Sequence, residues 1–227
     1  MRLIGHSSPF HLQTTASLTE AATGITTGHM EPNQKLCVYC GSGPGRDPIY
    51  MEAARTLGKS IAENKLGLVY GGGSLGLMGE TARSVLKAGG HVTGVIPDFL
   101  VKREQMLTDV QQLIVTQDMH ERKMTMFEHA SGFVALPGGI GTLEELVEVS
   151  TWAQLDQHNK PIVLANIDGY WNPLIELMDH MRAEHFIRAG LELRLEVVST
   201  ADEIVPAYLK SVKKRKPTAA KPIRGTV

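Results

Sequence analysis

Two adjacent carboxylates, Glu144 and Glu145, follow a proline and three glycines in the segment 134–146. An apolar run from Phe133 to Leu136 precedes the glycines, and an amphipathic run follows them. This order predicts a buried strand, a tight loop and the start of a helix. Glycines let backbone N–H groups approach a ligand closely, and the first turn of a helix attracts an anion such as phosphate. The segment therefore predicts a phosphate site with a carboxylate beside it.

A second charged cluster, Arg122 and Lys123, lies at the start of another predicted helix, for which Asp118 is a suitable N-cap. A solvated helix surface is the ordinary interpretation of such charges. However, a predicted strand precedes this helix too, so its start should open on the same crevice as the glycine loop. Arginine offers a rigid fork of donors for phosphate or carboxylate. We interpret His120, in the same turn, as a packing or capping residue.

Two glycine-rich turns resemble standard nucleotide motifs without matching them. Residues 71–76 satisfy G-x-G-x-x-G, but the next predicted strand ends in Ile-Pro at 96–97, where a ribose-binding acid is expected. We interpret this turn as close packing and one wall of a mononucleotide pocket. The loop at 137–145 lacks the Gly-Lys-Ser/Thr ending of a P-loop, so magnesium-dependent ATP hydrolysis has no support.

Strands and helices alternate along the chain from Lys35 onward. Strands are predicted at 36–40, 66–70, 91–96, 113–116, 133–136, 161–165 and 196–199, with helices at 48–64, 75–88, 119–130, from the glycine loop to about 157, 173–183 and 201–211. This alternation predicts an α/β fold: a doubly wound parallel sheet with helices on both faces. Ligands bind such sheets beyond the carboxyl ends of the strands, where glycine clusters at 41–45, 71–73 and 138–141 should line one crevice.

We expect a single folded domain with an extension at each end. Residues 1–34 show no clear periodicity and lack the apolar core of a signal peptide, which predicts a flexible N-terminal extension. Residues 35–211 form the nucleotide-binding domain. Residues 212–227, rich in Lys and Pro, are predicted to be a basic disordered tail.

The charge distribution argues against nucleic acid as a partner. The net charge is −1, and residues 210–227 carry seven basic side chains and no acidic one, which leaves −8 on residues 1–209. Nucleic-acid-binding domains usually carry a basic patch instead. No apolar run approaches the roughly 18–20 residues that cross a bilayer, so no membrane association is expected. A cytoplasmic location is the default expectation.

The two cysteines, Cys37 and Cys40, match C-x-x-C but lie within a predicted strand. Three residues apart, they should point to opposite faces of the sheet, whereas the redox motif lies at a helix start. Two cysteines exclude a disulfide framework, and without a second pair a zinc site is not expected. We interpret both as buried structural residues and predict no metal.

The helix after the glycine loop has two contrasting sides. Leu143, Leu146, Val147 and Ser150 form a stripe that should pack on the sheet. Glu145 lies on the other side, with Glu148, Val149 and Trp152. Because this side mixes carboxylates with apolar residues, we hypothesise that it meets a second subunit near the active site.

Together, these segments resemble the LOG family, the cytokinin riboside 5′-monophosphate phosphoribohydrolases, from about Lys35 to Ile187. The motifs that carry the resemblance occur in family order and spacing at 37–42, 69–73, 76–79, 94–97, 119–123, 136–145 and 151–155. The resemblance implies a Rossmann-like sheet and an assembly of two or more identical chains. Residues 1–34 and the basic tail lie outside the family pattern.

The resemblance also implies functional residues. Arg122 and Glu145, the last residue of P-G-G-x-G-T-x-x-E, would be the catalytic pair. The implied substrate contacts are Glu104, Arg122, Lys123, Gly138, Gly139, Ile140, Gly141, Thr142, Leu143, Glu144, Glu145 and Thr151. The segment around Glu104 departs from the pattern, because it carries no strong motif.

The implied reaction is hydrolysis of the N-glycosidic bond of a nucleoside 5′-monophosphate, giving free base and ribose 5-phosphate. Cleavage of this kind passes through an oxocarbenium-like transition state. Glu145 would stabilise the positive charge and orient or deprotonate water. Arg122 stays protonated and would act electrostatically. Residues 138–142 and Lys123 would bind the 5′-phosphate, with no metal or redox cofactor required.

The sequence is also compatible with two other classes of protein. A nucleotide-binding carrier or sensor could use the same crevice without hydrolysis. A pyridoxal-phosphate-dependent lysine decarboxylase, the label long attached to this family, needs a lysine Schiff base and an acidic partner for the pyridine nitrogen, which the sequence does not identify. The sequence also leaves open whether the substrate is a cytokinin nucleotide, AMP or another monophosphate.

Overall fold

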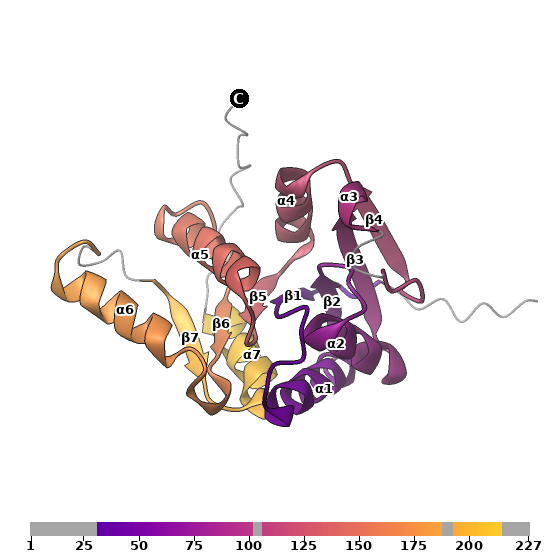
Figure 1. The fold of residues 1–227 in the computed structure, drawn as a ribbon, viewed down its shortest axis with the longest axis horizontal. Helices are drawn as coiled ribbons and strands as arrows, with labels where there is room; N and C mark the ends of the chain where they lie inside the picture. Colours follow the sequence, from indigo (N-terminus) through magenta and orange to yellow (C-terminus); the bar gives the residue numbers. More distant parts are fainter. Residues whose placement is uncertain (1–30, 102–105, 188–192, 215–227) are drawn as a thin grey trace, which may run out of the picture.

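The computed structural model describes residues 31–101, 106–187 and 193–214. Its centre is a seven-stranded parallel sheet in the order β4-β3-β2-β1-β5-β6-β7 (Figure 1). The strands are β1 (Lys35–Tyr39), β2 (Gly67–Tyr70), β3 (His91–Pro97), β4 (Gln112–Thr116), β5 (Gly132–Ala135), β6 (Ile162–Ala165) and β7 (Leu195–Val198). The predicted parallel α/β sheet is confirmed.

Helices cover both faces of this sheet (Figure 1). They are α1 (Pro48–Glu63), α2 (Gly76–Lys87), α3 (Asp98–Val101), α4 (Met119–His129), α5 (Ile140–Gln154), α6 (Asn172–Ala183) and α7 (Ile204–Lys214), with short 3₁₀ turns η1 (Ile167–Gly169) and η2 (Ala201–Glu203). One buried cluster joins α1, α2 and α7 to the sheet, and another joins α4 and α5 to its opposite face. Since alternate strand residues point to opposite faces, this arrangement explains why the central strands are apolar throughout.

The strand order reverses at β1, because the chain first adds β2, β3 and β4 on one side and then β5, β6 and β7 on the other. Ligands of such folds bind at this switch point, beyond the carboxyl ends of the strands. The loops after β1 and β5 meet there: the N–H of Gly41 donates to the carbonyl of Pro137 at 3.1 Å. The start of α2, which follows the loop after β2, joins them, since the N–H of Met78 donates to the carbonyl of Gly41 at 3.3 Å. The predicted glycine-lined edge is therefore formed.

Two helices end about three residues from the expected position. Helix α5 ends at Gln154, about three residues early, because Asp156 adopts a left-handed conformation (φ 54°). The N–H of Gln157 then reaches the carbonyl of Trp152, and that of Asp156 reaches Ala153, a Schellman arrangement that usually uses glycine. The final helix extends to Lys214 rather than 211.

Candidate active site

Arg122 lies near the start of α4 with its guanidinium buried at the carboxyl edge of the sheet. Asp118 caps the helix as predicted, its carboxylate accepting the N–H of Glu121 at 2.8 Å. The Nε of Arg122 donates to the carbonyl of Val95 in β3, 3.3 Å away. Only 9% of Arg122 is exposed. The solvated helix surface is therefore the wrong interpretation for this residue.

Gly71 makes room for that guanidinium at the end of β2. A Cβ at position 71 would lie 2.2 Å from Nη2 of Arg122 and 3.2 Å from Sδ of Met78. Gly72 has a φ of 79° and packs against Ile96. The G-x-G-x-x-G turn is thus a close-packing element, as interpreted, and its first glycine admits a site residue.

Glu145, in the second turn of α5, faces Arg122. Its Oε1 lies 3.4 Å from Nη1 of Arg122, and Glu145 is 9% exposed. Burial raises the pKa of Glu145 to about 7, because desolvation outweighs the attraction of Arg122. A carboxyl group in this range can exchange a proton near neutral pH, which is typical of a catalytic acid or base.

Lys123 forms a second link between α4 and α5. Its Nζ lies 2.7 Å from Oε1 of Glu144 and 3.0 Å from Oε1 of Glu148. Partial burial alone would lower the pKa of Lys123, but the hydrogen bonds to Glu144 and Glu148 raise it. The structure therefore brings Arg122, Lys123, Glu144 and Glu145 together, and it adds Glu148 as a second partner for the lysine.

The glycine loop leaves the N-terminus of α5 open. Gly139 is the N-cap residue and provides no side-chain cap, so the N–H groups of residues 140–142 lack both an intrahelical partner and a capping side chain. Thr142 is buried, and its Oγ1 occupies the space where a Cβ on Gly138 would lie. Ile140 is 83% exposed. Such an end suits an anion.

Tyr170, which sequence reasoning missed, also contacts this loop. Its hydroxyl donates to the carbonyl of Gly138, and its ring meets that of Tyr50 edge-on at 5.6 Å between centroids. Tyr170 follows η1, 32 residues from its partner. No local motif could have signalled this contact, because it depends on how β5 and β6 pair.

Two predicted contact residues, Thr151 and Leu143, are not brought to the Arg122–Glu145 pair. The hydroxyl of Thr151 donates to the carbonyl of Val147 in its own helix at 2.8 Å, and Leu143 lines an apolar pocket instead. Glu104 lies outside the described residues.

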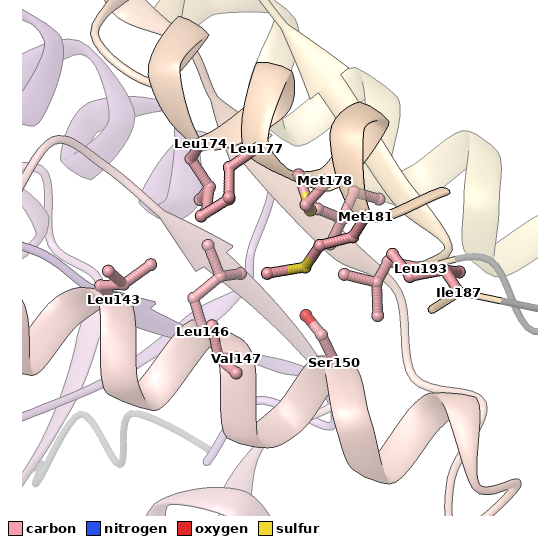
Figure 2. Close-up of a pocket in the computed structure, with 11 residues that line it drawn as sticks. Leu143, Leu146, Val147, Ser150, Leu174, Leu177, Met178, Met181, Ile187 and Leu193 are labelled. Carbon is pink, nitrogen blue, oxygen red and sulfur yellow. The ribbon is translucent and has the colours of Figure 1, made fainter. Parts of the chain in front are cut away.

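The apolar pocket, about 180 Å³, lies between α5 and α6 (Figure 2). Figure 2 shows side chains of the two helices pointing toward one another across it; α5 contributes Leu143, Leu146, Val147 and Ser150. Of these, Val147 is 47% exposed, whereas Val149 is buried in the cluster shared with α4. The expected assignment of the helix sides was therefore wrong in part, because α5 has a second apolar side that faces α6.

Part of the side of α5 assigned to a second subunit packs against α4 within the chain. Val149 is buried, and the ring of Trp152 meets that of Phe127 of α4 edge-on, 5.1 Å between centroids. The mixture of carboxylates and apolar residues on this side is explained by α4. Glu148 and Trp152 stay partly exposed, and the hypothesis that this side also meets a second subunit stays a prediction.

Both cysteines are free and buried, as predicted. Cys37 belongs to the cluster under α4 and α5, and Cys40 to the opposite one, so they point to opposite faces. Burial raises the pKa of each thiol, which keeps both inert. In the described part of the chain, no group of three or more His, Cys, Asp or Glu residues could hold a metal ion, and no helix there is long and apolar enough to span a membrane.

Comparison with solved structures shows the same fold in a molybdenum cofactor carrier protein from Chlamydomonas reinhardtii. The match has a TM-score of 0.56 and 24% identity, and covers 81% of this chain and 99% of the carrier. The molybdenum cofactor binding protein of Rippkaea orientalis gives a TM-score of 0.57 at 23% identity, covering 79% of this chain and 98% of that one. At this identity the likeness concerns the fold alone.

Sequence relatives are much closer. A family model described as "Possible lysine decarboxylase" matches residues 78–208. Cytokinin riboside 5′-monophosphate phosphoribohydrolase LOG7 of Arabidopsis thaliana is 49% identical over 172 residues, 76% of this chain and 79% of the relative. The probable phosphoribohydrolase LOGL2 of Oryza sativa subsp. japonica is 44% identical over 190 residues, 81% of this chain and 78% of the relative. With this identity over most of both chains, the protein belongs to the LOG family of cytokinin riboside 5′-monophosphate phosphoribohydrolases.

Proposed function

We propose that this protein hydrolyses the N-glycosidic bond of cytokinin riboside 5′-monophosphates, and also that of AMP, giving free base and ribose 5-phosphate. The observation that carries the proposal is the buried Arg122–Glu145 pair, 3.4 Å apart, beside the open N-terminus of α5. The relatives named as phosphoribohydrolases support it.

In this proposal, Glu145 does the central chemistry. As the C1′–N bond breaks, its electron pair leaves with the base and the ribose becomes oxocarbenium-like. Ionised Glu145 stabilises that charge and accepts a proton from water, whose hydroxyl goes to C1′. The proton ends on the base nitrogen. Arg122 holds the carboxylate and the substrate in register.

The 5′-phosphate would be bound chiefly by backbone N–H groups of residues 140–142. Lys123 remains a predicted contact, but Glu144 and Glu148 already balance its charge. Because a phosphate must compete with these carboxylates for the ammonium, we expect Lys123 to contribute less to phosphate binding than the backbone N–H groups do.

The proposed reaction is tested with a panel of nucleoside monophosphates and the matching nucleosides, with products separated by chromatography. We expect free base and ribose 5-phosphate from the nucleotides and little product from the nucleosides. The absence of free base from every nucleotide would favour the non-catalytic carrier or sensor.

Lysine decarboxylation fits the site poorly. A Schiff base requires a neutral amine, whereas the lysine of this site, Lys123, is kept protonated by two carboxylates. We therefore expect no carbon dioxide release from lysine when pyridoxal phosphate is supplied.

The pH dependence follows from the state of Glu145. Only the ionised carboxylate can accept a proton, and burial raises the pKa of Glu145 to about 7. We therefore expect kcat/KM to fall about fivefold between pH 7 and pH 6, the response to one group titrating near 7. A steady-state pH profile with AMP checks this.

The substrate phosphate titrates in the same region, so the profile needs a control. Adenosine 5′-phosphorothioate ionises at lower pH than AMP, and the acidic limb should keep its midpoint with this substrate. A limb that moves with the substrate, or one centred near the ordinary Glu value of 4.5, would contradict the assignment to Glu145.

We further propose that a second copy of the chain covers the pocket between α5 and α6. Helix α6 has no buried residue, yet Leu177 and Met181 line the pocket while 47% and 39% exposed. Apolar side chains gathered in this way mark association surfaces. The family resemblance also implies an assembly of identical chains.

Leu177→Glu should shift the protein from dimer or larger assembly toward monomer, because it places a charge in the apolar contact. Light scattering at micromolar concentration measures the mass. His180→Glu, an exposed change in the same helix, is the matched control and should keep the parental mass. A monomeric parent, or an unchanged mass for Leu177→Glu, would refute the assignment of this surface.

A further inference from the structure

The ammonium of Lys160 lies at the C-terminal end of α4. Its Nζ donates to the carbonyl of Phe127 at 2.6 Å and lies 3.9 Å from the centroid of the same residue's ring. Within the described ranges, no carboxylate forms an ion pair with Lys160. The cation is held instead by the negative end of a helix and by an aromatic face, two interactions that favour the charged amine.

The loop that carries Lys160 is itself fastened to α5. The backbone N–H of Lys160 donates to Nδ1 of His158 at 3.0 Å, and Nε2 of that ring lies 2.8 Å from the carbonyl of Val149. Since Nδ1 accepts, Nε2 carries the hydrogen and donates to Val149, which describes a neutral imidazole. Lys160 therefore joins the end of α4 to a loop anchored on α5.

These contacts involve the two helices, α4 and α5, that carry Arg122 and Glu145. Phe127 is five residues after Arg122 on α4, and Trp152 is seven residues after Glu145 on α5. The two aromatic rings meet edge-on, 5.1 Å between centroids. Because a helix moves as a rigid body over so few residues, a shift at the Phe127 end moves Arg122 as well.

We propose that Lys160 is a positioning residue, whose ammonium fixes the place of α4 and so the separation of Arg122 from Glu145. Its kinetic consequences rest on the proposed hydrolysis. Lys160 touches neither substrate nor reacting atoms in this proposal. It acts through the carbonyl and ring of Phe127.

The ammonium of Lys160 can lose its proton at a mildly alkaline pH. Partial burial lowers the pKa of Lys160 to about 8. The titratable groups that face it are the thiol of Cys37 in β1, the carboxylate of Glu128 in α4 and the imidazole of His158 in its own loop. Cys37 stays neutral, because burial raises its pKa. Loss of the Lys160 charge should therefore weaken the hold on α4 above pH 8.

The kinetic test compares Lys160→Met, Lys160→Arg and the parent with AMP. Since a misplacement of about 1 Å can cost up to about 10²-fold in rate, we expect Lys160→Met to lower kcat by about tenfold with little change in KM. Lys160→Arg keeps the charge and should restore most of kcat. It should also move the alkaline decline of kcat away from pH 8, because arginine does not titrate there.

Lys87→Met is the matched control, because Lys87 is an exposed lysine in the last turn of another helix, α2. It should behave as the parent. Parental kcat in Lys160→Met, or an unchanged alkaline decline in Lys160→Arg, would overturn the positioning role.

A second readout separates this proposal from the proposed function. In a Trp171→Phe background, the fluorescence of Trp152 reports its contact with Phe127, and it should show a transition near pH 8 that Lys160→Arg removes. If the parent releases no base, the proposed function fails while this titration still tests Lys160. A transition that persists in Lys160→Arg, or none in the parent, overturns the positioning role whatever the activity.

Discussion

Replacing Glu145 with glutamine should abolish release of adenine from AMP while leaving nucleotide binding nearly intact. The amide has almost the shape of the carboxylate, but it carries no charge and cannot accept a proton from water. General-base catalysis alone is typically worth about 10²–10⁴-fold in rate, so turnover should fall by at least that factor. Product chromatography measures the rate, and calorimetric titration with AMP measures the binding.

Glu144→Gln is the matched control, because it makes the same chemical change one residue away. Glu144 is exposed and pairs with Lys123, which keeps Glu148 as a second partner. We expect its loss of activity to stay within about fivefold, the scale of an exposed ion pair worth at most about 1 kcal/mol. Parental turnover in Glu145→Gln, or equal losses in both variants, would show that the proton acceptor lies elsewhere. Thermal unfolding of both variants verifies that the fold is retained.

The order of strands and helices could be predicted from the sequence because a parallel sheet is covered on both faces. Strands covered on both faces are short apolar runs, and here glycine clusters mark the ends of β1 and β2. The end of α5 was less readable. Its left-handed residue is Asp156 rather than glycine, and the hydrogen bonds that stop the helix come from the backbone.

The sequence predicted which residues belong to the candidate site better than it predicted how they are arranged. The family motif and the helix starts pointed to Arg122 and Glu145, and the structure places their charged groups 3.4 Å apart. Helical periodicity, however, assigned Val147 to the sheet, although it faces α6. A periodicity argument seeks one apolar side, and a helix packed between a sheet and another helix has two.

The remaining features of the site depend on contacts between distant segments. The hydrogen bond from Tyr170 to the Gly138 carbonyl requires β6 to lie beside β5. The hydrogen bond from Lys160 to the Phe127 carbonyl requires the loop after α5 to lie against the end of α4. Neither contact produces a local sequence pattern. Gly71 does belong to a recognisable motif, but the motif does not indicate that this glycine makes room for the guanidinium of Arg122.

Gly71→Ala should therefore inactivate the enzyme without unfolding it. The new Cβ would lie 2.2 Å from Nη2 of Arg122, a distance that forces the guanidinium to move. Because that group is the far end of a flexible side chain, it can swing aside at small cost to the fold, but it then loses its place opposite Glu145. A displacement of about 1 Å at a reacting centre can lower the rate about 10²-fold, and we expect kcat/KM with AMP to fall on that scale.

Gly43→Ala provides the comparison, since a Cβ at that position would meet no atom within 4 Å and the change lies at the same edge of the sheet. Its kcat/KM and melting temperature should stay close to those of the parent. For Gly71→Ala, a large kinetic loss with a nearly parental melting temperature would show that this glycine serves the position of Arg122. Equal kinetics in the two variants would mean that Arg122 tolerates displacement, and its electrostatic role beside Glu145 would have to be abandoned. A collapse of the Gly71→Ala fold would instead show that the turn, rather than the guanidinium, sets the requirement for glycine.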